Sequence, residues 1–216
     1  MRNLSVNPGV QVARKKLSAA QRRAQLIDVG RKAFAEKGFE ATSVEEIASR
    51  AGVSKPIVYQ HFGGKEGLYA VVVDREMNRV VEVISAAIAS GNARERVDKA
   101  ALAFLTYVKE HPDGFRVLSL DAPVASGRGC MSSLMNDVAE RVEHVVGSVF
   151  TEAGYDPKMA PIYANALVGM VSFVGQWWTE AREPAVEVVA THLSALAYLG
   201  LRHLPHAPDA IPPLEG

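Results

Sequence analysis

The stretch from Thr42 to Lys65 constrains the fold of this chain more than any other; it reads TSVEEIASRAGVSKPIVYQHFGGK. Its apolar spacing predicts two short helices separated by a tight turn. Ser43 is placed to cap the first helix, and Glu46 would complete a capping box that satisfies two backbone N–H groups. Gly52 ends that helix, since glycine accepts the left-handed conformation of a sharp stop. The stretch therefore predicts a helix-turn-helix unit.

The second helix of the unit begins after Ser54, which can cap it, and Pro56 fits only in a first helical turn. Val58 and Phe62 lie four residues apart, so both face the inside of the unit. The remaining side chains point outward or flank the outer surface: Lys55, Ile57, Tyr59, Gln60 and His61. An outer face of this composition suits the groove of a nucleic acid.

Two runs of residues together carry a family resemblance. They are Ile47-Ala48-x-x-Ala51-Gly52-Val53-Ser54 with Tyr59-x-His61-Phe62 and Lys65, and the upstream segment from Leu26-Ile27-Asp28 through Ala33-Phe34-Ala35-Glu36-Lys37-Gly38-Phe39. This pattern resembles the TetR family of bacterial transcriptional repressors, over residues 22–68 or about a fifth of the chain. One position departs from the family: Gly64 stands where a capping Ser, Asn or Asp is frequent.

Helical periodicity continues through the rest of the chain, and no segment alternates as a strand would, so we predict an all-α fold. The predicted organisation has four parts: a disordered basic arm over 1–17, a helix-turn-helix DNA-binding domain over 18–64, a helical effector-binding and dimerisation domain over 65–205, and a disordered tail over 206–216. The long helix expected from Lys65 to about Ser90 would connect the two domains.

The charge of the chain is divided unevenly along its length, although the formal net charge is zero. Residues 1–64 hold 11 Lys and Arg against 5 Asp and Glu, while residues 65–216 hold 13 against 19. A basic N-terminal part followed by an acidic remainder is typical of a DNA-reading domain attached to a body that does not bind DNA. The acidic body favours a neutral or cationic effector over an anionic one.

In the major groove, Lys55 could donate to guanine, Gln60 could pair with adenine, and the surface of Pro56 and Ile57 could contact a thymine methyl group. The resemblance implies phosphate contacts for three further residues: Tyr59, His61 and Lys65. A helix N-terminus attracts phosphate, which adds the hydroxyl side chains of Thr42 and Ser43, and Ser54 completes the predicted interface.

The resemblance also implies a homodimer that binds a palindromic operator, and a small-molecule effector, largely apolar, that releases it. Large and adaptable side chains on several helices are the candidates for the effector pocket: Phe104, Tyr107, Phe115, Leu118, Met131, Met135, Met170 and Trp177. Carried over by position, the last two helices supply the candidate dimer interface: Tyr163, Leu167, Val174, Trp178, Leu193, Leu196, Ala197, Gly200 and Leu201.

Other functional classes find little support in the sequence. No HExxH, P-loop or nucleophile-elbow pattern is present, so we expect neither an enzyme nor a cofactor. Cys130 is the single cysteine, which excludes an intrachain disulfide, and the histidines follow no metal-ligand spacing. The N-terminus lacks an apolar signal region, so a cytoplasmic protein is expected. Two alternatives remain open: a dimeric helical interaction module without specific DNA binding, and a TetR-like activator without a ligand.

Overall fold

The structure, a computed structural model, describes residues 17–119 and 130–205, with side chains of the second range from Leu134 onward. The described elements are α1 (Ala19–Ala41), α2 (Val44–Ala51), α3 (Lys55–Phe62), α4 (Lys65–Ile88), α5 (Ala93–Glu110), α6 (Pro112–Ser119), α7 (Cys130–Ala153), the 3-10 helix η1 (Pro157–Met159), α8 (Ala160–Ala181) and α9 (Val186–Arg202). The predicted all-α fold is confirmed. The predicted tail and all but the last residue of the predicted arm lie outside the described residues.

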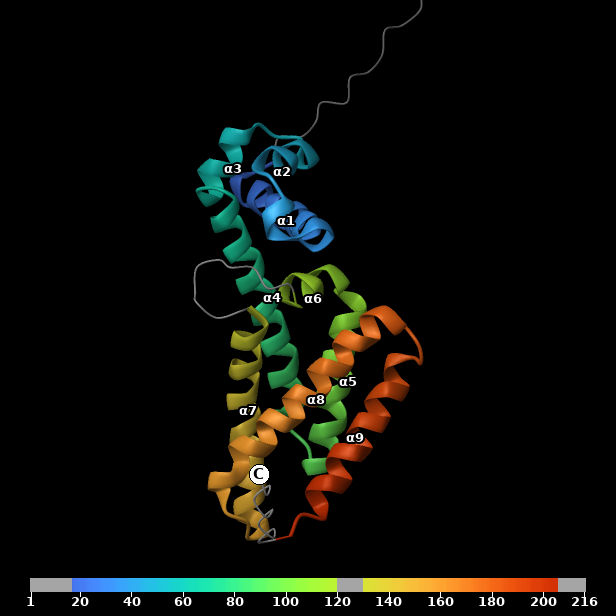
Figure 1. Ribbon diagram of the computed structural model, residues 1–216. Coiled ribbons are helices and arrows are strands. Elements are labelled where there is room, and N and C mark those ends of the chain that lie inside the picture. The colour runs from blue at the N-terminus through green and yellow to red at the C-terminus, as the bar shows by residue number, and fades with distance from the viewer. Residues whose placement is uncertain (1–16, 120–129, 206–216) are drawn as a thin grey trace, which may run out of the picture.

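The helices form a small head and a larger body, and α4 extends from one into the other (Figure 1). Helices α1, α2 and α3 make the head at one end of the molecule. The N-terminal half of α4 packs on α1 and α3, while the rest of it packs on α5 and α7 in the body. Among the described helices, none is long and apolar enough to cross a membrane.

The helix α1 begins at a capping box, because Ser18 Oγ accepts from the backbone N–H of Gln21 and the Gln21 side chain accepts from that of Ser18. The helix continues to Ala41 across a break at Gly38, whose φ of 78° lies in the left-handed region that favours glycine. The chain then brings Phe39 back onto the buried ring of Tyr69 in α4, with the two ring centres 5.0 Å apart. This contact anchors the end of α1 on the helix that leads into the body.

The helix-turn-helix unit forms where it was predicted, with small differences at the caps. Ser43 Oγ accepts from the backbone N–H of Glu46, but the Glu46 carboxylate turns to Lys37 and Arg50, so only half of the expected capping box is present. Gly52 has a φ of 64° and ends α2 as predicted. Ser54 occupies the N-cap position of α3 without a side-chain hydrogen bond.

The body ends in two helices joined by a bend. The second of them, α9, begins at Val186. The residues before it form the bend, where Trp178 Nε1 donates to the carbonyl of Pro184 at 2.7 Å. Both α8 and α9 pack against α5, and α8 also packs along α7. These helices and α4 surround the interior of the body.

Candidate nucleic-acid interface and effector cavity

The ends of α2 and α3 are held by polar side chains of α1. Arg23 Nη1 donates to the carbonyl of His61 at 2.9 Å, and its guanidinium lies 4.5 Å from the centre of the Phe62 ring. Gln25 Nε2 donates to the carbonyl of Ala51 at 3.1 Å. Both bonds satisfy carbonyls that the last helical turn leaves without a partner. Arg23 thereby fixes the position of α3.

Lys65 holds the junction between α1 and α4. Its Nζ donates to the carbonyl of Phe39 at 3.1 Å and lies 4.2 Å from the centre of the Phe39 ring. A cation at this place also interacts favourably with the C-terminal end of a helix. The predicted phosphate contact of Lys65 remains a prediction, and an ammonium group has three donors to share between the two tasks.

Gly67 lets α3 and α4 approach each other closely. A Cβ atom at Gly67 would lie 1.9 Å from the carbonyl oxygen of Phe62, the last residue of α3. No side chain can be accommodated there unless the two helices separate.

Gly67→Ala is therefore expected to destabilise the protein by about 1–3 kcal/mol through overpacking, and to weaken DNA binding because α3 is displaced. Urea unfolding and a DNA-binding titration measure the two effects. Gly147→Ala is the matched control, since its Cβ would meet only Ala160 Cβ at an ordinary 3.8 Å. Unchanged stability and affinity of the Gly67 variant would mean that the helix junction is not rigid.

The outer side of α3 exposes most of the side chains predicted to contact DNA. Ser54, Lys55, Pro56, Tyr59 and Gln60 are exposed, while Ile57 and His61 are half-buried beside the buried Val58. Tyr59 leaves 47% of its surface to solvent. Exposed aromatic and amide side chains on a fixed short helix are able to enter a major groove.

The Lys55 ammonium is paired with the carboxylate of Glu45 on α2 and lies 5.9 Å from the centre of the Tyr59 ring. The hydrogen bond from Lys55 lowers the pKa of Glu45, and the same bond raises the pKa of Lys55. Both groups are therefore charged near neutral pH. Because this exposed pair is weak, Lys55 can exchange the carboxylate for an acceptor on DNA.

Thr42 was predicted to contact a phosphate, but the structure places it in the interior. The residue is buried, and its hydroxyl donates to the carbonyl of Gly38 at 2.7 Å. The side chain thus closes the end of α1 and faces away from solvent. Ser43 is exposed at the N-terminus of α2, so of the two hydroxyls only that of Ser43 is accessible to a phosphate.

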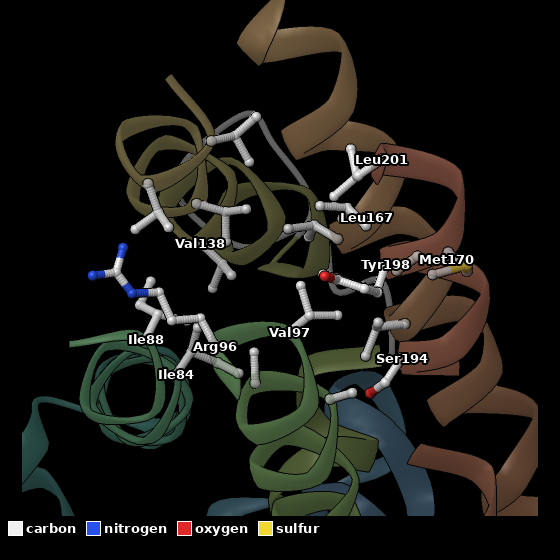
Figure 2. A pocket seen from close by; sticks show the side chains of 18 of the residues that line it. Ile84, Ile88, Arg96, Val97, Val138, Leu167, Met170, Ser194, Tyr198 and Leu201 are labelled. Carbon is white, nitrogen blue, oxygen red and sulfur yellow. The ribbon is translucent and has the colours of Figure 1, made fainter. Parts of the chain in front are cut away.

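The body contains an apolar cavity of about 390 Å³ (Figure 2). Its walls come from α4, α5, α7, α8 and α9, as well as Tyr155. Three of the predicted pocket residues line it: Phe104, Met135 and Met170. Three others are buried elsewhere in the core: Tyr107, Phe115 and Leu118. Trp177 is exposed on α8, and the side chain of Met131 lies outside the described part of the chain.

The structure places the predicted dimer residues in three different environments. Four of them line the cavity: Leu167, Leu193, Ala197 and Leu201. Three pack inside the subunit: Trp178 is buried, Tyr163 packs on Phe150, and Val174 packs on the main core. Only Leu196 and Gly200 are exposed. The prediction had thus chosen largely the inward side of both helices.

Large apolar side chains do face outward on these two helices. On α8 they are Ile162, Phe173 and Trp177; on α9 they are Val188, Leu196 and Leu199. Phe173 leaves 74% of its surface exposed and Leu196 leaves 65%. Of the six, only Leu196 was among the predicted dimer residues, while Trp177 was predicted for the pocket and the other four were not predicted for any site. We refer to all six as the outer apolar face.

Two families of known proteins match this chain. Residues 26–72 match the family described as bacterial regulatory proteins, tetR family, and residues 82–211 match the family described as tetracyclin repressor-like, C-terminal domain. The second match alone covers more than half of the chain.

Individual relatives agree with these matches. The transcriptional activator FasR of Mycolicibacterium smegmatis is 27% identical over 193 residues, which cover 88% of this chain and 87% of FasR. The transcriptional repressor AcnR of Corynebacterium glutamicum is 32% identical over 63 residues, 29% of this chain and 34% of AcnR. A TetR-like transcriptional regulator from Rhodococcus sp. RHA1 has a solved structure with 30% identity and a TM-score of 0.73, covering 88% of this chain and 100% of that one.

The helix-turn-helix head, the helical body and both family matches lead to one conclusion. This chain belongs to the TetR family of DNA-binding transcriptional regulators.

Proposed function

We propose that this regulator binds a near-palindromic operator as a homodimer in the cytoplasm, acts as a repressor, and is released by a small molecule bound in the body cavity. The observation that carries the proposal is the geometry of α3. Its exposed side chains are presented on a helix that Arg23 and Gly67 hold against the rest of the head. A rigidly placed recognition helix is what base readout requires.

Repression needs only that the bound protein blocks access to the DNA, so binding alone is sufficient for it. Activation is the second candidate, because FasR, a relative that matches over 88% of this chain, is named an activator. AcnR, which is named a repressor, matches over 63 residues, or 29% of this chain. A reporter gene behind the selected operator separates the two: expression rises on deletion of a repressor and falls on deletion of an activator.

The cavity is the candidate effector site because α4 connects it with the head. Val80, Ile84 and Ile88 in the second half of α4 line the cavity, and the first half of the helix packs on α1 and α3. A ligand that changes the packing around these residues therefore shifts the helix that supports the recognition helix. For release, the ligand must bind the DNA-free state more tightly than the DNA-bound state.

Selection of duplex DNA from a random library tests the proposal. We expect an inverted repeat whose affinity falls steeply with salt, as phosphate contacts require. Repeating the selection with Gln60→Ala should lose the preference at one base position of each half-site, with a cost of about 1–3 kcal/mol for that contact. Weak uniform binding without a consensus would favour the alternative of a helical interaction module.

A further inference from the structure

Two polar atoms in the lining of the cavity are buried and bond no partner among the described residues. They are Nε of Arg96 on α5 and Oγ of Ser194 on α9. Ser194 is only 1% exposed. Buried donors are normally bonded, and each one left unpaired is unfavourable. Both atoms therefore point to a ligand that supplies acceptors inside this cavity.

The charge of the lining is positive. Arg96 and Arg202 are its charged residues, and no Asp or Glu lines the cavity in the part of the chain that the structure describes. The acidic neighbours of Arg96 on α5 are engaged elsewhere: Asp98 accepts from Arg94 at 3.0 Å, and Glu95 pairs with Lys99 at 3.9 Å. Arg96 forms no ion pair with any described residue, and its guanidinium lies at the edge of the cavity.

The rest of the lining is apolar and extends away from Arg96. Figure 2 shows the Arg96 guanidinium at one edge of the cavity near Ile84 and Ile88 of α4, and Ser194 at the opposite side. Between them lie aliphatic side chains such as Val97, and the volume of about 390 Å³ is in the range of small-molecule sites. A bound molecule would meet a cation at one end and hydrocarbon along most of its length.

We propose that the effector is an elongated apolar anion, namely an alkyl or acyl chain with one anionic head group of the carboxylate kind. The head group pairs with Arg96, whose planar guanidinium matches the geometry of a carboxylate. This inference rests on the proposed role of the cavity, and it replaces the neutral or cationic effector expected from the acidic body, because the charges lining the cavity decide which head group it accepts.

The position of Arg96 also explains how such a ligand would be sensed. Its side chain lies against the C-terminal part of α4, next to Ile84 and Ile88 (Figure 2). A carboxylate bound to the guanidinium would fill the space beside α4, the helix that connects the body to the DNA-binding domain. The apolar chain alone would fill the cavity without engaging this edge.

Calorimetric titration of the full-length protein with dodecanoate, dodecan-1-ol and dodecyltrimethylammonium tests the proposal, with the two ionic probes below their micelle concentrations and the alcohol below its solubility limit. Dodecanoate should bind more tightly than the alcohol, and the ammonium compound most weakly. Arg96→Ala should weaken dodecanoate binding about 10- to 150-fold, as expected for bonds to a charged group, and leave the affinity for the alcohol nearly unchanged. Lys109→Ala is the matched control, because it removes an exposed cation of the same helix that does not line the cavity, and it should retain the preference for dodecanoate.

Any of three results would overturn the proposal: equal binding of the alcohol and dodecanoate, preference for the ammonium compound, or an Arg96→Ala variant that keeps its selectivity. If the protein selects an operator but binds none of the probes, the proposed anionic effector is wrong and the proposed DNA-binding function is retained. If the protein selects no operator, the proposed function is wrong whatever the cavity binds. The ratio of the two affinities in each variant separates loss of the head-group contact from general loss of stability.

Discussion

Glu76→Ala is expected to lower the free energy of unfolding by about 3–5 kcal/mol, the cost of breaking a buried ionic contact by removing one partner. The Glu76 side chain is 2% exposed. Its carboxylate accepts from the hydroxyl of Tyr107 at 3.1 Å and from Arg79 Nη1 at 3.1 Å, with Arg31 Nε 4.0 Å away. Without the carboxylate, the buried hydroxyl and the two guanidinium groups lose their shared acceptor.

This cluster joins the head to the body. Arg31 lies on α1 and also pairs with Asp113 of α6 at 3.3 Å, while Tyr107 belongs to α5. Burial and the neighbouring Glu76 carboxylate raise the pKa of Tyr107, so its hydroxyl stays protonated and keeps donating across the neutral range. We therefore expect that the folded Glu76→Ala protein still binds DNA, and that an effector lowers its DNA affinity less than it lowers that of the wild type.

Urea unfolding measures the effect on stability. Glu82→Gln, an exposed change on the same helix, is the control and should alter stability by less than about 0.5 kcal/mol. Adding Tyr107→Phe to Glu76→Ala should cost less than the sum of the two single changes, because the two groups share a hydrogen bond. Additive costs, or a Glu76 variant as stable as the control, would contradict the role given to the cluster.

The head could be predicted from the sequence because its signals are local. The left-handed stop at Gly52 and the buried Val58 depend on residues within one or two helical turns. The contacts of Arg23 and Gln25 with the ends of α3 and α2 join residues 38 and 26 positions apart. No periodic pattern reports such contacts, so both residues were missed.

Helices α8 and α9 show a different limit of prediction from the sequence. On α8, Leu167 lines the cavity, Trp178 is buried and Phe173 is exposed, so apolar residues occupy opposite sides of the same helix. Helical spacing identifies a face only when the opposite face is polar. The sequence therefore did not show which apolar side of these helices faces outward, and the prediction selected mainly residues of the inward side.

Some residues predicted for the effector pocket do not line the cavity, for a related reason. We weighted large aromatic side chains, but Tyr107 and Phe115 fill the core beside α6, where they leave no space. The cavity lies instead among smaller side chains such as Val97 and Val138, with Phe104 at its wall. A cavity forms where side chains are too small to meet, and that depends on the distance between helices far apart in the sequence.

Leu196→Glu is expected to convert the proposed homodimer to monomers and to weaken operator binding by about 10²- to 10⁴-fold, since two linked heads gain that much over one. Leu196 belongs to the outer apolar face and is 65% exposed in the single chain. In a two-fold interface the same patch is used on both subunits, so one substitution introduces two carboxylates. Burying them without partners is unfavourable, and dimers would not form.

Analytical ultracentrifugation of the wild type and the variant gives the oligomeric state, and titration of the selected operator gives the affinity. Leu102→Glu is the matched control, because Leu102 is 40% exposed on α5 outside the outer apolar face. A monomeric wild type would remove the homodimer altogether. A Leu196→Glu protein that still sediments as a dimer would place the interface elsewhere. A monomeric variant that binds the full operator as tightly as the wild type would mean that one head is sufficient, and it would contradict the proposed role of the dimer. We expect the opposite, because the base contacts of one recognition helix in half a site are too few to discriminate within a genome.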